Sequence, residues 1–313
     1  MMMDTHPLMD LKTDYAFKQR FGQPQTADIL MAFVNALLKR EDADRFVASD
    51  WPNTEIAPSR RSGKGKRLDV YVHSERGERL HIEIQVGRVA AWPKRSLLYW
   101  SSLYEAQALA GMDYGALHRM ITINIVNFVM LPSTARYHTS YHVYEDAQRF
   151  LLTDVFEVHC VELPKFRRTR GGQMLAIAQD PLGRWLLLLD AAKNRRIREA
   201  LEVIAMADPT MDHALGVWEE LSQDPEQYAA YLSRRMALLD EVSQVHSAEQ
   251  KGLEKGLQRG LERGLEKGLE KGFRQAQWAI ARAMLADGES IARVMKLTGL
   301  PAEEVADLQR HES

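Results

Sequence analysis

The chain has 313 residues, of which 45% are hydrophobic and 27% are charged. This composition is typical of a globular protein and excludes an intrinsically disordered chain. The formal net charge of −2 gives no global positive field, so a site for a polyanion must be a local patch. The single cysteine, Cys160, excludes an internal disulfide and a zinc site built from cysteines.

The sequence lacks the patterns of secreted and membrane proteins. Residues 1–10 contain no apolar run of the secretory type, and the longest apolar run, residues 185–189, is far too short to cross a bilayer. We therefore expect a cytoplasmic protein with no membrane partner and no small-molecule organic cofactor.

Residues 14–39 have the pattern of helices that bury one face. Apolar residues recur there at three- and four-residue spacing. Gly22 and Pro24 interrupt the pattern, so we expect two helices instead of one.

Residues 68–73 and 80–86 alternate between apolar and polar side chains. A period of two predicts two half-buried strands. Residues 74–78, which include Gly77, supply a hairpin loop of ordinary length.

The apolar pattern also predicts the register of this hairpin. For both apolar sets to share a core face, the numbers of paired residues must sum to an even value. A five-residue loop pairs His73 with Arg79 and places Asp69 opposite Glu83. Side chains opposed in this way have Cβ atoms about 4.5–5.5 Å apart.

Two carboxylates so close together repel each other, and something must compensate them. They could be solvated, paired with Arg67 or another base, or separated by strand twist. The functional alternative is a hard divalent cation, because Mg²⁺ takes one or two carboxylates, keeps waters and accepts phosphate oxygens. Such an ion polarises a phosphodiester and supplies hydroxide near neutral pH. The hairpin alone leaves these explanations open.

Helices and strands interleave up to about residue 166, which predicts an α/β domain over residues 10–170. A helical region follows over residues 171–250, with a break at Asp208-Pro209 and a long helical run from Pro225 onward. Within the α/β domain we expect a helix from Pro93 to about residue 110 and strands at residues 120–130, 137–144 and 155–163.

Several motifs occur together in the N-terminal half. Asp69, followed after thirteen residues by Glu83-Ile84-Gln85, resembles the E-x-Q variant of the PD-(D/E)XK nuclease pattern. The other motifs are Asp14-Tyr15-Ala16-Phe17-Lys18, Phe21-Gly22, Arg67-Leu68-Asp69-Val70, Arg95 followed by Tyr99 and Tyr104, and His159 through Glu162-Leu163-Pro164-Lys165-Phe166. In this order they resemble the recombination-promoting nuclease (Rpn) family, also catalogued as PD-(D/E)XK nuclease family transposases.

The resemblance implies an α/β fold with a mixed PD-(D/E)XK nuclease-like sheet flanked by helices. It also implies DNA cleavage assisted by a divalent metal, Mg²⁺ or in its place Mn²⁺ or Ca²⁺, and a role in recombination or transposition. Asp69 and Glu83 would be metal ligands. Asp14 matches an acid of the first helix that often assists such sites, and a simple helix N-cap is the alternative.

Gln85 departs from the family pattern, because lysine usually holds its position. A neutral amide can orient a water but offers no positive charge to the developing phosphorane. We expect Lys18, Lys66 or Arg95 to supply that charge. Arg95 either faces the phosphate or satisfies a helix end.

A polar loop at residues 59–67 carries five positive charges in nine residues. Such a run can neutralise several phosphates and give sequence-independent, salt-sensitive DNA affinity, and a solvated loop is the alternative. The candidate DNA-binding residues are Arg60, Arg61, Lys64, Lys66 and Arg67.

Residues 251–272 repeat Lys/Arg-Gly-Leu-Glu/Gln with a period of four. Six glycines cost a helix about 5 kcal/mol relative to alanine, so a lone helix would be marginal. A parallel partner helix would bury the leucines over about 33 Å, and we therefore expect a homodimer through this repeat. A flexible linker is the alternative.

The C-terminal segment, residues 273–313, has helical blocks separated by Gly288 and Gly299, as in helix-turn-helix geometry. Basic and acidic residues balance there, which favours a small protein-docking bundle over a DNA reader.

The opposed acids and the family resemblance together lead us to expect a divalent-metal-dependent DNA endonuclease. Its candidate catalytic residues are Asp69, Glu83, Gln85, Lys18 and Arg95, and its candidate metal ligands are Asp69, Glu83 and Asp14. The alternatives are a catalytically degenerate DNA-binding protein, which Gln85 favours, and an oligomeric interaction protein that acts through its C-terminal helices. The intact acid pair favours the enzyme.

Overall fold

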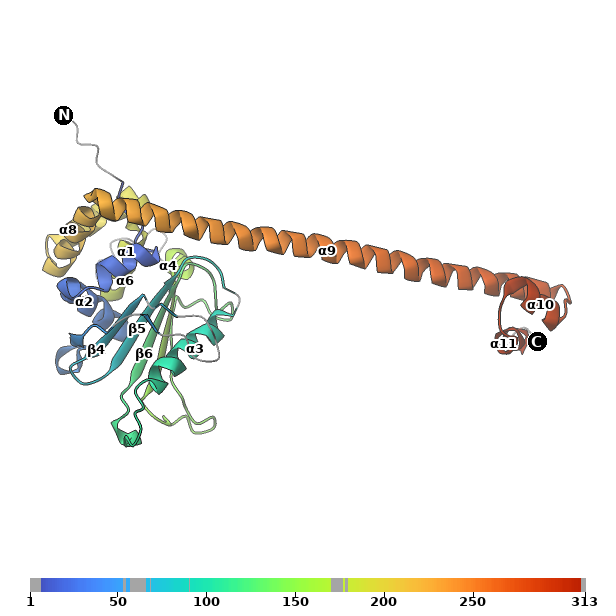
Figure 1. Ribbon diagram of the computed structural model, residues 1–313, viewed down its shortest axis with the longest axis horizontal. Coiled ribbons are helices and arrows are strands. Elements are labelled where there is room, and N and C mark those ends of the chain that lie inside the picture. Colours follow the sequence, from blue (N-terminus) through green and yellow to red (C-terminus); the bar gives the residue numbers. More distant parts are fainter. Residues whose placement is uncertain are drawn as a thin grey trace, which may run out of the picture. The chain divides into compact units, whose positions relative to one another are not determined.

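A computed structural model describes residues 7–52, 55–56, 66–67, 69–89, 91–169, 177 and 180–310. The chain forms two compact units, residues 1–239 and residues 240–313 (Figure 1). None of the described helices combines the length and the apolar character that crossing a bilayer requires.

Two N-terminal helices, α1 (Asp14–Phe21) and α2 (Ala27–Leu38), confirm the predicted break between them. A Cβ at Gly22 would lie 2.7 Å from the carbonyl oxygen of Lys18, so glycine is needed where α1 ends. The apolar faces of both helices enter one core, in which the Phe21 ring packs against Trp185 of α6. Short 3-10 turns are η1 (Pro24–Thr26), η2 (Asp42–Asp44), η3 (Tyr114–Ala116) and η4 (Ala191–Lys193).

The central sheet is mixed and has six strands in the order β1-β4-β5-β6-β8-β7. β5, β6 and β8 run parallel, whereas the other neighbours pair antiparallel. The strands are β1 (Ala48–Asp50), β4 (Val70–Ser74), β5 (Arg79–Gln85), β6 (Met120–Val126), β7 (His138–Tyr141) and β8 (Phe156–Glu162). The sequence patterns missed β1 and a separate two-stranded pair, β2 (Glu55–Ile56) with β3 (Lys66–Arg67).

The hairpin has the predicted register. His73 pairs with Arg79 and Val70 with Ile82, so the paired numbers sum to an even value. The expectation of half-buried strands is correct for β4 but wrong for β5, where polar His81 is buried as well. The cause is helix α3 (Trp92–Glu105), which covers the second face of the sheet.

The two faces of the sheet therefore have different neighbours. Leu80 and Ile82 face the core with α1, α2 and α6, whereas the His81 ring contacts Tyr99 of α3. Neighbouring residues in register point to the same side of a sheet. His159 pairs with Ile123, and Ile123 pairs with Ile82, so His159 lies on the α2 side.

A layer of helices completes the first unit. α8 begins at Pro209 with Asp208 as its N-cap, which confirms the predicted break. Trp218 of α8 donates its indole hydrogen to the carbonyl of Met9, so the N-terminal segment is fixed against this layer. The helices are α4 (Leu163–Thr169), α6 (Pro181–Asp190), α7 (Arg195–Ala205), α8 (Pro209–Gln223) and α9 (Pro225–Ala286).

The second unit contains residues 240–286 of α9, α10 (Ile291–Thr298) and α11 (Ala302–Arg310). Gly288 and Gly299 adopt positive φ angles of 83° and 70°, which lets the chain turn after α9 and after α10. The small apolar core is formed by Ala281, Val294, Leu300 and Val305.

Candidate active site

Asp69 lies directly before β4 and points at the neighbouring strand. Its Oδ2 accepts a hydrogen bond of 2.8 Å from the backbone N–H of Ile84. Burial raises the pKa of the Asp69 carboxyl well above its ordinary value, and the charges of Glu83 and Asp14 raise it further. The hydrogen bond from Ile84 and the charge of Lys18 oppose this rise without cancelling it. The positive charge around Asp69 is thus too small to offset the effects that raise the pKa of its carboxyl group.

Glu83 is buried, with only 4% of its surface exposed. Its Oε2 lies 3.3 Å from Nε2 of His81, and its Oε1 lies 3.4 Å from a guanidinium nitrogen of Arg95. The explanation that the acids are solvated is therefore wrong for Glu83, and pairing with a base holds for it. His81 is itself fully buried, and its Nδ1 has no hydrogen-bond partner among the described atoms.

Arg95 stands in the first turns of α3 and is held by two aromatic rings. Its guanidinium lies 5.0 Å from the ring centre of Trp92 and 5.2 Å from that of Tyr99, and its Nε donates to the Tyr99 hydroxyl over 3.1 Å. Its partner Glu83 is a strand residue, so the idea that Arg95 satisfies a helix end is wrong. The side chain remains 40% exposed, so it can also meet a ligand.

Helix α1 brings Asp14 and Lys18 to the same place, because the charges of both act on the pKa of Asp69. Asp14 is not the N-cap that we considered as an alternative. The N-cap is Thr13, whose hydroxyl accepts from the N–H of Ala16. Asp14 Oδ2 accepts instead from Nε of Arg234 in α9, over 2.7 Å.

Gln85 ends β5 with its side chain turned along the chain. Its Nε2 donates to the carbonyl of Gly87 over 3.1 Å. The side-chain amide therefore lies at the end of the strand that carries Glu83. Its side-chain oxygen, Oε1, is available as an acceptor.

The predicted basic run falls mostly outside the described residues, as Arg60, Arg61 and Lys64 do. For Lys66 and Arg67 the structure describes the backbone, which forms β3. Their contact with DNA remains a prediction.

The acid pair suits a magnesium-like ion. The described residues contain no group of three or more His, Cys, Asp or Glu side chains that could hold a metal. A hard ion of this type, however, needs only one or two carboxylates and keeps its waters. Asp69 and Glu83 offer that donor set, and a bound cation would oppose the effects of burial and of the Glu83 charge that raise the pKa of Asp69.

Three side chains of this site were not singled out from the sequence as site residues. His81 has a local signal, since it shares a face with Glu83 two residues away, but its burial depends on α3. Tyr99 appeared only within a motif. Arg234 contacts Asp14 from 220 positions away, which no local pattern reveals.

Comparison with known families identifies two segments. Residues 11–248 match the family described as "PD-(D/E)XK nuclease family transposase". Residues 274–310 match the C-terminal helix-turn-helix domain of the Rpn/YhgA-like nuclease family. No curated protein and no solved structure matches the chain. Because the first match covers well over half of the sequence and its sheet carries the acid pair, this chain belongs to the PD-(D/E)XK nuclease family transposases.

Proposed function

We propose that this protein is a cytoplasmic, divalent-metal-dependent DNA endonuclease that hydrolyses phosphodiester bonds. The observation that carries the proposal is the pair of half-buried Asp69 and buried Glu83, in which the pKa of Asp69 is raised well above its ordinary value. Nucleases of the PD-(D/E)XK family typically use divalent metals, and carboxylate oxygens are the ligands that such ions prefer. The family membership also supports a role in recombination or transposition.

Each side chain of the site has a defined task in this proposal. Asp69 and Glu83 would hold the ion, assisted by Asp14, and the bound ion would polarise the phosphodiester and lower the pKa of a water. Lys18 lies beside the acids and offers positive charge to the phosphate, as does the exposed side of Arg95. Gln85 orients a water through its free carbonyl oxygen while its amide nitrogen is fixed by Gly87.

Two other segments would hold the DNA. The helix-turn-helix match over residues 274–310 favours DNA binding there, against the protein-docking bundle that the charge balance suggested. The basic run at residues 60–67 would add contacts to phosphates. Neutralising Arg60, Arg61, Lys64, Lys66 and Arg67 together should weaken DNA affinity and flatten its salt dependence.

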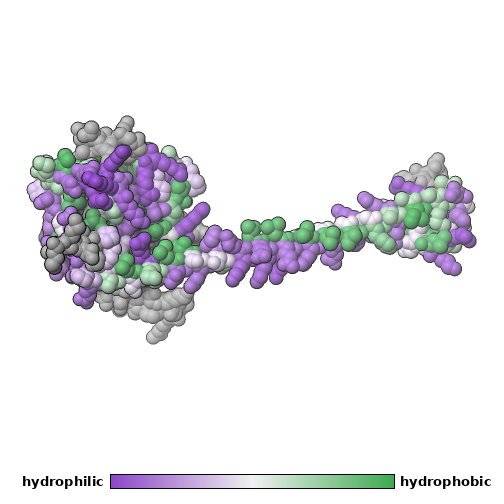
Figure 2. All heavy atoms as spheres, turned by 90° about the horizontal axis from the view of Figure 1, so that it is seen from above, coloured by the Kyte–Doolittle hydropathy of each residue, from purple (hydrophilic) through white to green (hydrophobic). Residues whose placement is uncertain are grey.

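The repeat in α9 would join two copies of the chain. Its leucines form a stripe of hydrophobic side chains along one side of the helix (Figure 2). A Cβ added at any glycine of the repeat would meet no atom within 4 Å, so a second helix has room to approach. The exposed fractions are 68% for Leu253, 67% for Leu257, 74% for Leu261, 64% for Leu265 and 68% for Leu269.

This dimer is tested by light scattering of the full chain and of a chain ending before Lys251. We expect a dimer and a monomer, respectively, and we expect the shortened chain to nick plasmid more than it cuts both strands. A full-length monomer at micromolar concentration would leave the repeat as a tether.

The decisive test of the activity is incubation of supercoiled plasmid with the purified protein. We expect nicked or linear DNA with Mg²⁺ or Mn²⁺ and intact plasmid with EDTA. DNA binding without cleavage under any of these metals would support the second candidate, a degenerate DNA-binding protein. The absence of the usual lysine at Gln85 favours that candidate.

A further inference from the structure

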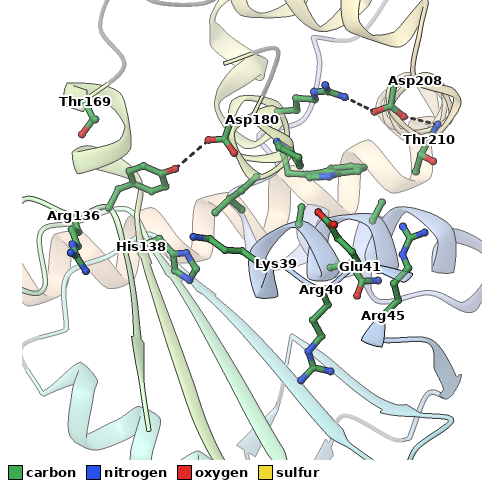
Figure 3. Close-up of a pocket in the computed structure, with 18 of the residues that line it drawn as sticks. Lys39, Arg40, Glu41, Arg45, Arg136, His138, Thr169, Asp180, Asp208 and Thr210 are labelled. Carbon is green, nitrogen blue, oxygen red and sulfur yellow. Dashed lines mark hydrogen bonds and ion pairs between the residues drawn. The ribbon is translucent and has the colours of Figure 1, made fainter. Parts of the chain in front are cut away.

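A large cavity lies on the α2 side of the sheet, the opposite side from Glu83. It has two connected parts of about 1220 Å³ and about 620 Å³, which share Lys39, Arg136 and His138 in their walls (Figure 3). The larger part is walled by α2, α6 and the start of α8, and the smaller by β7 and β8. None of the proposed catalytic residues lines either part.

Several charges in the cavity wall have partners within the protein. Arg184 pairs with Asp208 over 3.2 Å, and Figure 3 shows Arg40 pointing toward the sheet, where it binds Glu78 over 2.9 Å. Within the described part of the chain, the side chains of Lys39 and Arg136 make no hydrogen bond and no ion pair, although their backbone N–H groups do bond. Both are exposed to solvent, and they face the same hollow.

The backbone of Lys39 is unusual. It ends α2 in the left-handed region, with φ 56° and ψ 43°, where glycine or asparagine is the ordinary choice. Lysine at this position costs backbone strain, and strained residues concentrate at binding sites. The side chain leaves the helix end and extends toward His138 in Figure 3.

A chain of hydrogen bonds prepares His138 for a negatively charged ligand. Its Nε2 lies 2.9 Å from Nδ1 of His159, whose Nε2 lies 2.9 Å from Oε1 of Glu157. The carboxylate can only accept, so His159 donates from Nε2. With His159 neutral, its Nδ1 accepts and His138 donates from Nε2. The remaining Nδ1 of His138 is then a lone pair, and one added proton turns it into a donor toward the cavity.

Without a bound anion, the surroundings of His138 disfavour its protonated form. Burial lowers the pKa of His138 to about 4, helped by the neighbouring His159 and by the positive charge of Lys39. The other charged or titratable groups around it are Arg136 and His142 in the same hollow and Glu157 from β8, whose charge is matched by Arg119 and Arg40. An anion between Lys39 and His138 would reverse this balance.

We propose that the cavity binds a nucleotide, with its phosphate monoester between Lys39, Arg136 and His138 and its nucleoside in the larger part. A phosphate monoester carries close to two negative charges at pH 7, which two unpaired cations and a protonated histidine match. Asp180 and the exposed Glu41 can accept from sugar hydroxyls or base amines. Small-molecule sites measure about 300–1,000 Å³; the smaller part lies within this range and the larger part, at about 1220 Å³, exceeds it, so a nucleotide has room.

The test is isothermal titration calorimetry of the full chain in EDTA, with dAMP, inorganic phosphate, deoxyadenosine and a single-stranded DNA 12-mer as probes. We expect dAMP to bind. Inorganic phosphate should bind more weakly than dAMP, and the affinity for deoxyadenosine should be at least tenfold lower than that for dAMP. Lys39→Gly, which suits the left-handed backbone, and Arg136→Ala should each lower dAMP affinity tenfold or more. Arg196→Ala, an exposed cation outside the cavity, should leave it unchanged.

Proton uptake gives a second readout. Between pH 7 and 8, titrations in buffers with different ionisation enthalpies should show dAMP binding that takes up a proton, and His138→Gln should remove this uptake. The proposal is overturned if dAMP does not bind, if deoxyadenosine binds equally well, or if the cavity variants bind like the wild type. Binding of the 12-mer that is tighter than that of dAMP and is weakened by Lys39→Gly and Arg136→Ala would overturn a nucleotide site and assign the cavity to a DNA strand. EDTA keeps every outcome independent of cleavage.

Discussion

Glu157 and Glu83 are buried acids on opposite faces of the same sheet, and each is bonded to a histidine two residues away. The charges around the two acids differ. Burial raises the pKa of Glu157, but the hydrogen bond from His159 and the charges of Arg119 and Arg40 outweigh burial and leave the pKa lowered. On the other face, Asp69 beside Glu83 has a pKa raised well above its ordinary value.

The comparison separates a structural carboxylate from a candidate functional one. Glu157 has its positive charges built into the protein, so its cluster stabilises the fold without a ligand. The pair of Asp69 and Glu83 lacks part of that charge, and a bound cation would supply it. Substitutions of these three acids and of Gln85 test the distinction.

The largest effect is expected from removing either acid of the uncompensated pair. Asp69→Ala and Glu83→Ala should each reduce metal-dependent plasmid cleavage to background, because a single carboxylate holds the ion poorly. Circular dichroism should show an unchanged fold. Glu75→Ala, an exposed acid in the turn of the same hairpin, serves as the control and should cut normally. Full activity in either site variant would remove the assignment.

Substitution of Glu157, whose charge is compensated, should lower stability and leave cleavage intact, the opposite of the result expected for Asp69 and Glu83. Glu157→Ala leaves His159 without its carboxylate, while Arg40 keeps Glu78, and breaking a buried pair in this way costs up to about 3–5 kcal/mol. Chemical denaturation should show this loss, while the molecules that remain folded still cleave DNA. Unchanged stability would mean that Glu157 is not compensated by its neighbours as described.

Gln85 tests the third position of the motif. If its carbonyl oxygen orients the attacking water, Gln85→Ala should lower the cleavage rate about a hundredfold, the size expected from a misplaced reactant. Gln85→Lys should keep part of the activity, since it restores a donor and a positive charge. A Gln85→Ala variant as fast as the wild type would show that this residue has a structural role only.

The smallest expected effect concerns stability without metal. The folded-state pKa of Asp69 is raised, so the unfolding free energy falls as pH rises from the ordinary carboxyl range, about 3.9, through the folded value. Asp69→Asn removes this cost. In EDTA at pH 8 its Tm should exceed that of the wild type by about 2–4 °C, which corresponds to roughly 1 kcal/mol in a domain of this size. The gain should vanish below pH 3.9, and an equal gain at all pH values would contradict the explanation.

Much of the site follows from local patterns. The alternation of Val70, Val72, Leu80 and Ile82 predicts the hairpin register, since only one parity buries all four. The opposed acids follow from that register. Gly22 and Pro24 likewise predict where α1 ends before α2 begins.

The remainder depends on contacts between distant segments. The burial of Glu83 requires α3 to pack on the second face, and strand alternation contains no information about that packing. The ion pair of Asp14 with Arg234 joins the two ends of the first unit. Thr13 and Asp14 are both good N-cap residues, so sequence alone could not choose between them. Strand β1 has only three residues, too few to establish a period.

The pairing of β4 with β5 also restricts how such a chain can change length during evolution. Inserting or deleting one residue within either strand would transfer one acid to the opposite side of the sheet, because side chains alternate. Two such changes, or a longer turn at residues 75–78, would keep both acids on the same face of the sheet. Natural length variants of this hairpin should therefore conserve an even separation between the two acids, whatever the size of the turn.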